Sequence, residues 1–146
     1  MASTKELQEQ IVGNMNRWKK VEDASVASTG QIMEKTDNEL IRLVMEIIQR
    51  DSQTHHQVQE FIASTLEHKP VSITPEEMAK VWEGIEHHIE IEKKAMAMAR
   101  ENLDALKGKK MVVQEYLLNY LLEDEEKHNK MLETLDKIKD GMYPYG

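Results

Sequence analysis

The stretch 68-HKPVSITP-75 divides this sequence into two halves. Proline interrupts helices because it lacks a backbone N–H and clashes with the preceding turn. Two of the 3 prolines of the chain, Pro70 and Pro75, lie in this stretch. The residues 1–69 and 76–143 are therefore free to form long helices on either side of it.

Capping signals predict where these helices begin and end. Thr74 is the expected N-cap at the end of the dividing stretch, with proline at the first helical position and Glu77 closing a capping box. Thr36 and Glu39 offer another capping box, and Gly108 with the basic residues around it favours a helix C-terminus. We therefore expect four helices, at about 4–33, 37–68, 75–107 and 110–139, followed by an irregular tail at 141–146.

These helices predict an all-α fold. At a rise of 1.5 Å per residue, each helix would be roughly 45 Å long. Helices of similar length joined by short links pack as neighbours that run in opposite directions. The sequence therefore predicts an antiparallel up-down-up-down four-helix bundle that forms a single domain over residues 1–146.

Composition excludes several classes of function. The formal net charge is −8, whereas a nucleic-acid-binding domain carries a basic stripe, so we expect no nucleic-acid partner. No apolar run approaches the roughly 20 residues of a membrane span, and the first residues, MASTKELQEQ, lack the apolar region of a signal peptide. There are 0 cysteines, which excludes disulfides, thiolate zinc sites and cysteine nucleophiles. We expect no membrane association and a cytoplasmic location.

Each expected core stripe carries polar residues near its middle. Apolar residues that face a core recur at alternating spacings of three and four. On the last helix this rule selects Leu118, Leu121, Glu125, His128, Leu132 and Leu135. The polar positions on the other three stripes are Glu22, Ser25 and Thr29 on the first, Ser52 and His55 followed by Val58 or Gln59 on the second, and His88 and Glu92 on the third.

These polar groups favour a metal site. Burying an unpaired carboxylate costs several kcal/mol in effective terms, and in an antiparallel bundle the middles of the helices lie at one level. Glutamate and histidine without cysteine suit iron, manganese or zinc. Two simpler interpretations stay open: a single core histidine is usually hydrogen-bonded, and Glu22 or Glu92 alone could lie at the edge of its stripe and reach water.

An internal repeat supports the pairing of these residues. Asp51-Ser52-Gln53-Thr54-His55-His56 aligns with Asp124-Glu125-Glu126-Lys127-His128-Asn129, so the chain reads as two helical hairpins. Glu22 precedes His55 by nearly the same separation as Glu92 precedes His128. Each glutamate is therefore expected opposite its own histidine across a hairpin.

The second hairpin resembles the ferritin-like superfamily, and within it the rubrerythrin-type proteins. The resemblance is carried by Ile89-Glu90-Ile91-Glu92-Lys93-Lys94-Ala95 and Leu121-Leu122-Glu123-Asp124-Glu125-Glu126-Lys127-His128. That fold holds two metals with one glutamate from each of two helices and a Glu-x-x-His motif from each of the other two. The resemblance implies that Glu92, Glu125 and His128 hold one metal and that Glu22 and His55 hold the other. It also implies iron as the cofactor, with a di-iron centre and ferroxidase- or peroxidase-like oxidation of Fe(II).

One position departs from the family pattern. Ser52 stands where the family has a glutamate, so the first hairpin lacks one carboxylate. His88, one turn before Glu92, could supply a nitrogen ligand instead, and Asp51 or His56 could turn inward. The alternative function is a non-enzymatic helical bundle with a degenerate metal site that acts in oligomerisation or protein interaction.

The sequence also leads to expectations about a further domain, about ligands and about oligomeric state. The rubredoxin-like domain of rubrerythrins needs paired cysteines, and we therefore expect no such domain here. Trp18 and Trp82 are expected to anchor contacts between helices or between subunits. We expect metal ions as ligands and a homo-oligomer, namely a dimer.

Overall fold

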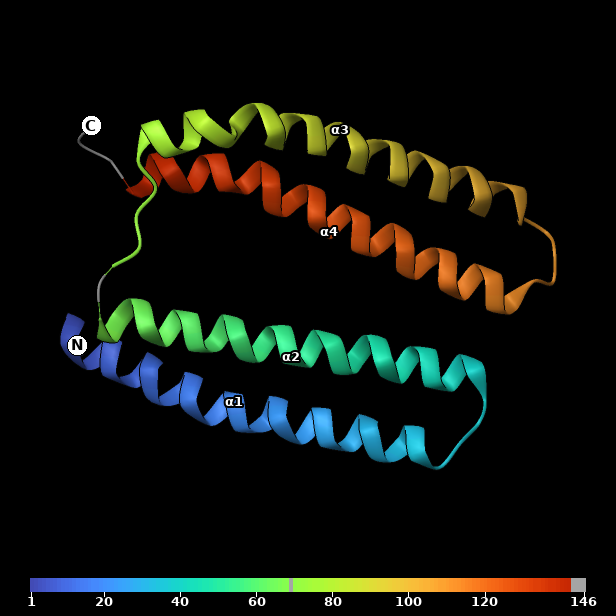
Figure 1. Cartoon of the computed structure of the whole chain (residues 1–146), viewed down its shortest axis with the longest axis horizontal. Coiled ribbons are helices and arrows are strands. Elements are labelled where there is room, and N and C mark those ends of the chain that lie inside the picture. Colours follow the sequence, from blue (N-terminus) through green and yellow to red (C-terminus); the bar gives the residue numbers. More distant parts are fainter. Residues whose placement is uncertain (69, 143–146) are drawn as a thin grey trace. The chain divides into compact units, whose positions relative to one another are not determined.

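The computed structural model describes residues 1–68 and 70–142 and contains four helices over these ranges, with no strand among the described residues (Figure 1). The helices are α1 (Thr4–Glu34), α2 (Glu39–Glu67), α3 (Pro75–Ala105) and α4 (Val112–Met142). The all-α prediction is confirmed. None of these helices combines the length and the apolar character that a membrane crossing requires.

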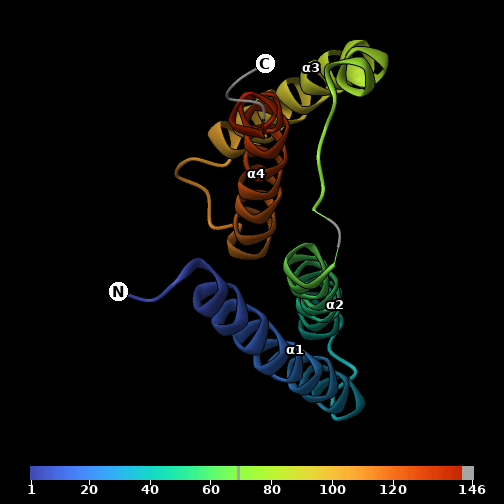
Figure 2. The ribbon, with the colours of Figure 1, turned by 90° about the vertical axis from the view of Figure 1, so that its left-hand side faces the viewer.

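The chain forms two compact units. The first spans Met1–Val71 and the second begins at Ser72, so the division falls inside the proline-containing stretch. In the first unit α1 packs along α2, and in the second α3 packs along α4, so each unit is a helical hairpin (Figure 2). The expectation of a single closed bundle stays a prediction.

The cap of α3 is the one that the sequence predicts. The Glu77 amide donates to Thr74 Oγ1 at 3.1 Å, and the Thr74 amide donates to Glu77 Oε2 at 3.0 Å. This reciprocal pair satisfies two backbone donors at the start of the helix. The same arrangement at Ser3 and Glu6 begins α1.

The expected start of α2 is wrong. Asn38, not Thr36, is the N-cap, and its Oδ1 accepts from the Ile41 amide at 3.0 Å. Thr36 Oγ1 instead accepts from the amide of Asn38 at 3.0 Å. Because the threonine hydroxyl is used before the helix begins, the helix starts later than predicted, at Glu39.

The α3–α4 connection and the end of α4 also differ from the prediction. α3 ends at Ala105 and α4 begins at Val112, so the connection between them is longer than expected, with Gly108 at a φ of 75° that favours glycine. The helix α4 runs through Gly141 to Met142, where the sequence predicts an irregular tail. A glycine near a helix end costs little enough for the helix to pass it. The rest of the expected tail, 143–146, lies outside the described residues.

Each hairpin buries only part of its apolar surface. The buried apolar residues among those described are Ala63, Met78, Met96 and Ala99. In the first hairpin, large apolar side chains stay exposed at multiples of seven residues: Ile11, Trp18 and Ile32 on α1, and Ile41, Ile48 and Ile62 on α2. We call these six residues the exposed stripe of the first hairpin. A hairpin with such a stripe retains apolar surface that packing against further helices would bury.

Candidate metal centre

Glu92 is the central carboxylate of the second hairpin. It lies on α3 and is only 5% exposed, so its carboxylate is almost removed from solvent. His88, one turn earlier on the same helix, places Nε2 at 2.8 Å from Glu92 Oε1. The other oxygen, Glu92 Oε2, is buried and has no hydrogen-bond partner while the Glu125 carboxyl is ionised. A buried carboxylate oxygen of this kind is costly unless a proton or a cation approaches it.

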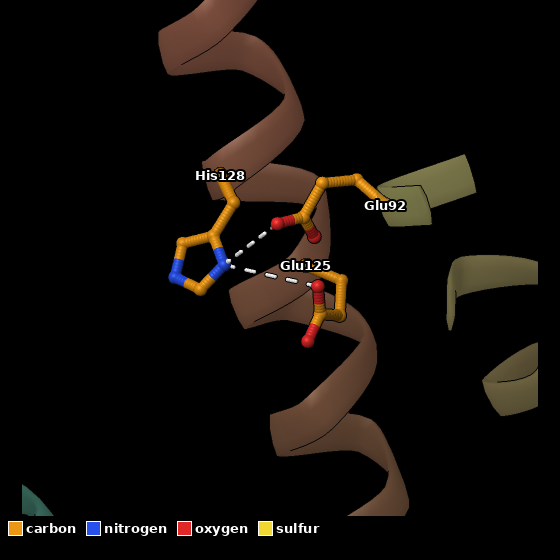
Figure 3. Close-up of side chains that lie close together, drawn as sticks. All are labelled: Glu92, Glu125 and His128. Atoms are coloured by element: carbon orange, nitrogen blue, oxygen red, sulfur yellow. Dashed lines mark ion pairs between the residues drawn. The ribbon is translucent and has the colours of Figure 1, made fainter. Parts of the chain in front are cut away.

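Two residues of α4 face Glu92. Glu125 and His128 are three residues apart and therefore share one side of the helix. His128 Nδ1 lies 3.5 Å from Glu92 Oε1 and 3.7 Å from Glu125 Oε2 (Figure 3). Glu92, Glu125 and His128 each offer one ligand atom such that all of these atoms lie within 4.8 Å of one another. Donor atoms bound to one metal ion through bonds of about 2.1 Å lie about 3–4 Å from one another. The three side chains would therefore need only small adjustments to bind one ion together.

The orientation of the His128 ring suits metal binding. Asp124 Oδ2 lies 3.3 Å from His128 Nε2, and Lys127 Nζ lies 2.8 Å from Asp124 Oδ1. When a cation lies between Nδ1 and the two glutamates, the carboxylate beside Nε2 would hold the ring proton on that nitrogen and leave the lone pair of Nδ1 for the cation. Asp124 thus holds the ring from the side opposite to the site.

The two glutamates have opposite pKa shifts. The hydrogen bond between the two carboxyls lowers the pKa of Glu92 and raises the pKa of Glu125 from the ordinary value of 4.5. Burial opposes the lowering of the Glu92 pKa and adds to the raised pKa of Glu125. The nearby His88 and His128 lower the pKa of Glu92 further. Between these two pKa values the pair holds one proton, which resides on Glu125, and a divalent cation would replace that proton.

The first hairpin brings together Glu22 and His55. Glu22 on α1 is buried, and His55 Nδ1 on α2 lies 3.4 Å from Glu22 Oε1. Among the described residues, however, the only group of three or more histidine or acidic ligands is the one in the second hairpin. Ser52 is buried and its Oγ lies 2.8 Å from Ser25 Oγ, so a hydroxyl pair occupies the position at which a Glu-x-x-His motif ending at His55 would have its carboxylate.

The structure also places the residues that the sequence left open in the first hairpin. Asp51 is exposed, and His56 places Nδ1 at 2.8 Å from Asp23 Oδ1 on the exposed side of the hairpin. Of the two residues left open on the α2 stripe, Val58 is exposed and Gln59 is buried. Gln59 Nε2 donates to Glu22 Oε1 at 3.3 Å. Sequence reasoning did not include Gln59 among the site residues, although it follows Ser52 by one heptad on the buried side.

Comparisons with known proteins identified no relative of this chain. No protein-family model matches the chain, and no curated protein or solved structure matches it at a significant level.

Proposed function

We propose that this chain is a metal-binding helical protein of the ferritin-like type, with a divalent metal held by Glu92, Glu125 and His128. The observation that carries the proposal is the buried Glu92 carboxylate, whose Oε2 has no hydrogen-bond partner while Glu125 is ionised, and which lies beside a second carboxyl and an imidazole. A cation would offset the cost of this buried charge. Two carboxylates and one imidazole nitrogen suit iron, with manganese and zinc as alternatives.

The residues around the ligands have distinct roles in this proposal. Asp124 keeps the Nδ1 lone pair of His128 directed at the metal. His88 holds Glu92 Oε1 at 2.8 Å and stays available as a further nitrogen ligand. Iron in such a site would supply one-electron chemistry for the oxidation of Fe(II) by O2 or peroxide, as the resemblance implies.

A protein of the ferritin-like type has a closed four-helix bundle, and the exposed stripe of the first hairpin supports such a bundle for this chain. Ile11, Trp18 and Ile32 on α1 recur at the spacing that an inward-facing stripe requires, as do their counterparts on α2. We propose that the two hairpins close into one four-helix bundle with the exposed stripe of the first hairpin inside. The expected homodimer stays a prediction that sedimentation measurements would test.

Metal content tests the proposed site. We expect the full-length chain, loaded with Fe(II) under anaerobic conditions and desalted, to retain about one tightly held metal ion by elemental analysis. Glu92→Gln and His128→Gln should lose this ion because each removes a ligand. Glu90→Gln is the matched control on α3, since Glu90 is exposed and pairs only with Lys93 at 3.7 Å among the contacts described. Metal content near zero in the wild type, or equal in Glu92→Gln, would show that the site does not bind metal.

One observation favours the alternative function. The hydroxyl pair of Ser25 and Ser52 satisfies the position of the missing carboxylate without any metal. A bundle whose site is degenerate in this way would act in oligomerisation or protein interaction. Under this alternative, removal of metal by a chelator leaves the melting temperature unchanged.

A further inference from the structure

Each hairpin buries one carboxylate, and the two carboxylates have different surroundings. Among the described residues, the buried polar ones are Glu22, Thr29, Ser52, Gln59 and Glu92. Only Glu92 belongs to the second hairpin, so the first hairpin surrounds Glu22 with further polar groups. The contacts of these groups indicate what the first hairpin can hold.

Glu22 lies beside groups that donate hydrogen bonds. Gln59 Nε2 on α2 donates to Glu22 Oε1 at 3.3 Å, and His55 Nδ1 lies 3.4 Å from the same oxygen. A buried carboxylate with such donors needs no cation to offset its burial. Glu92 instead meets the carboxyl of Glu125, so a proton or a cation has to lie between those two groups.

The Gln59 amide makes this contact at a cost to its own oxygen. Gln59 is 4% exposed, and its Oε1 is buried without a hydrogen-bond partner among the described residues. A half-turn of the amide would place Oε1 against the Glu22 carboxylate, and the two oxygen atoms would repel each other. The amide therefore keeps its nitrogen toward Glu22 and leaves its oxygen unpaired.

The neighbouring polar groups form hydrogen bonds with one another. Ser52 Oγ lies 2.8 Å from Ser25 Oγ. Thr29 Oγ1 donates to the backbone oxygens of Ser25 and Val26 at 2.8 and 3.0 Å. Gln49 Nε2 donates to the same Val26 oxygen at 3.2 Å. These groups find their partners within the hairpin and need no ion for their burial.

The balance of charge also disfavours a divalent cation beside Glu22. An ion held by Glu22, His55 and Gln59 would have one carboxylate against its two positive charges. The excess charge would lie in a buried place, where an uncompensated charge is costly. In the second hairpin, Glu92 and Glu125 together balance both charges.

We propose that Gln59 and His55 hold the Glu22 carboxylate in place of a metal ion, and that Gln59 determines that the first hairpin binds no metal. A metal centre in the second hairpin is then mononuclear, in contrast to the two metals that the resemblance implies. The first hairpin is a polar core that is stable without metal. This inference goes beyond the proposed function, because it holds whether or not the second hairpin binds an ion.

Exchange of the two groups tests the pairing of Glu22 with Gln59. In the full-length chain with a chelator, Gln59→Glu makes two carboxylates face each other and should lower the melting temperature by about 5 °C or more. Addition of Glu22→Gln restores one carboxylate and one amide and should recover at least half of this loss. Gln57→Glu is the matched control on α2, because Gln57 is exposed, and it should change the melting temperature by about 1 °C or less. A double variant that recovers nothing would overturn the pairing.

Mn²⁺ tests whether the first hairpin binds a metal. The background is the double variant Glu92→Gln and His128→Gln, which removes two ligands of the second hairpin. The measured quantity is the rise in melting temperature on addition of Mn²⁺, minus the rise in the same background with Glu22→Gln. We expect this difference to be zero within about 1 °C, and Gln59→Glu should increase it to about 5 °C or more, because two carboxylates then face one ion. A positive difference with Gln59 intact would overturn the proposal. No increase in Gln59→Glu would contradict the role of Gln59 in excluding metal.

The proposed function has a separate measurement. The wild type should bind an ion that His128→Gln loses. If the wild type binds no ion and the exchanged pair recovers its stability, the proposed function fails and this inference stands. If the wild type binds an ion that depends on His128 and the Mn²⁺ difference with Gln59 intact is positive, this inference fails and the proposed function stands.

Discussion

At the scale of single residues, Glu92 and Glu125 control the pH dependence of the second hairpin. Because the pKa of Glu125 is raised, its contribution to the stability of the metal-free protein is complete below 4.5 and is lost as the pH rises through the raised pKa. The pKa of Glu92 is lowered, so its contribution is present above 4.5 and is lost as the pH falls through the lowered pKa. The metal-free pair is therefore most stable between these two pKa values.

Glu125→Gln isolates the alkaline side of this dependence. The amide imitates the protonated carboxyl and cannot ionise, so the metal-free variant should unfold at a higher urea concentration than the wild type at pH 8. Near pH 4.5 the difference should shrink. Urea unfolding after chelation, over a pH series, measures both effects. The control is Glu123→Gln, an exposed neighbour on α4. Parallel pH profiles for the wild type and Glu125→Gln would contradict the shared proton.

At the scale of the helices, local rules predict most of what is observed. The cap of α3 at Thr74 and Glu77 follows from adjacent residues, as does the division of the chain at its prolines. The start of α2 could not be predicted equally well, because Thr36 and Asn38 are both good caps and only their mutual hydrogen bond decides between them.

The candidate site also could be predicted only in part from the sequence. The three-and-four spacing places Glu92, Glu125 and His128 on facing stripes, and the structure brings these three together. The spacing does not distinguish Val58 from Gln59, because both follow His55 at an allowed step. Which of them is buried depends on how α2 is rotated against α1, and this rotation is a property of the packed pair.

Ser52→Glu tests the role of the missing carboxylate at the level of α2. Ser52 is buried against Ser25, so a glutamate here loses the hydroxyl pair and buries a charge. The metal-free variant should be less stable by about 1–3 kcal/mol in the free energy of unfolding. Added Fe(II) or Mn²⁺ should then stabilise the variant more than the wild type, because a second carboxylate joins the first hairpin.

Ser52→Ala is the control for this substitution. It also loses the hydroxyl pair but adds no ligand, so its response to metal should equal that of the wild type. Thermal unfolding with and without metal compares the three proteins. If Ser52→Glu gains no more stability from metal than Ser52→Ala does, position 52 does not face a metal site.

At the scale of the whole molecule, the exposed apolar side chains are the feature that the hairpins leave unexplained. Each hairpin buries polar groups at its centre, including Glu22, Ser52 and Glu92, while large apolar groups stay at its surface. A hairpin of this kind gains little from its own core, and the hydrophobic contribution that stabilises a domain of this length needs further burial. The proposed bundle would supply this burial by covering the exposed stripe.

Two residues of α2 with equal exposure separate a closed bundle from independent hairpins. Ile48 belongs to the exposed stripe and is 41% exposed, whereas Leu43, outside the stripe, is 42% exposed. The position of Leu43 recurs one and two heptads later as Arg50 and Gln57, so it lies on a polar side of the helix. In a closed bundle Ile48→Glu places a charge in the interior and should lower the free energy of unfolding by about 2 kcal/mol or more, while Leu43→Glu should change it by about 0.5 kcal/mol or less. Independent hairpins would tolerate both substitutions alike, because each side chain is then equally exposed to solvent. Urea unfolding of the two metal-free variants beside the wild type measures the difference, and equal effects would reject the closed bundle.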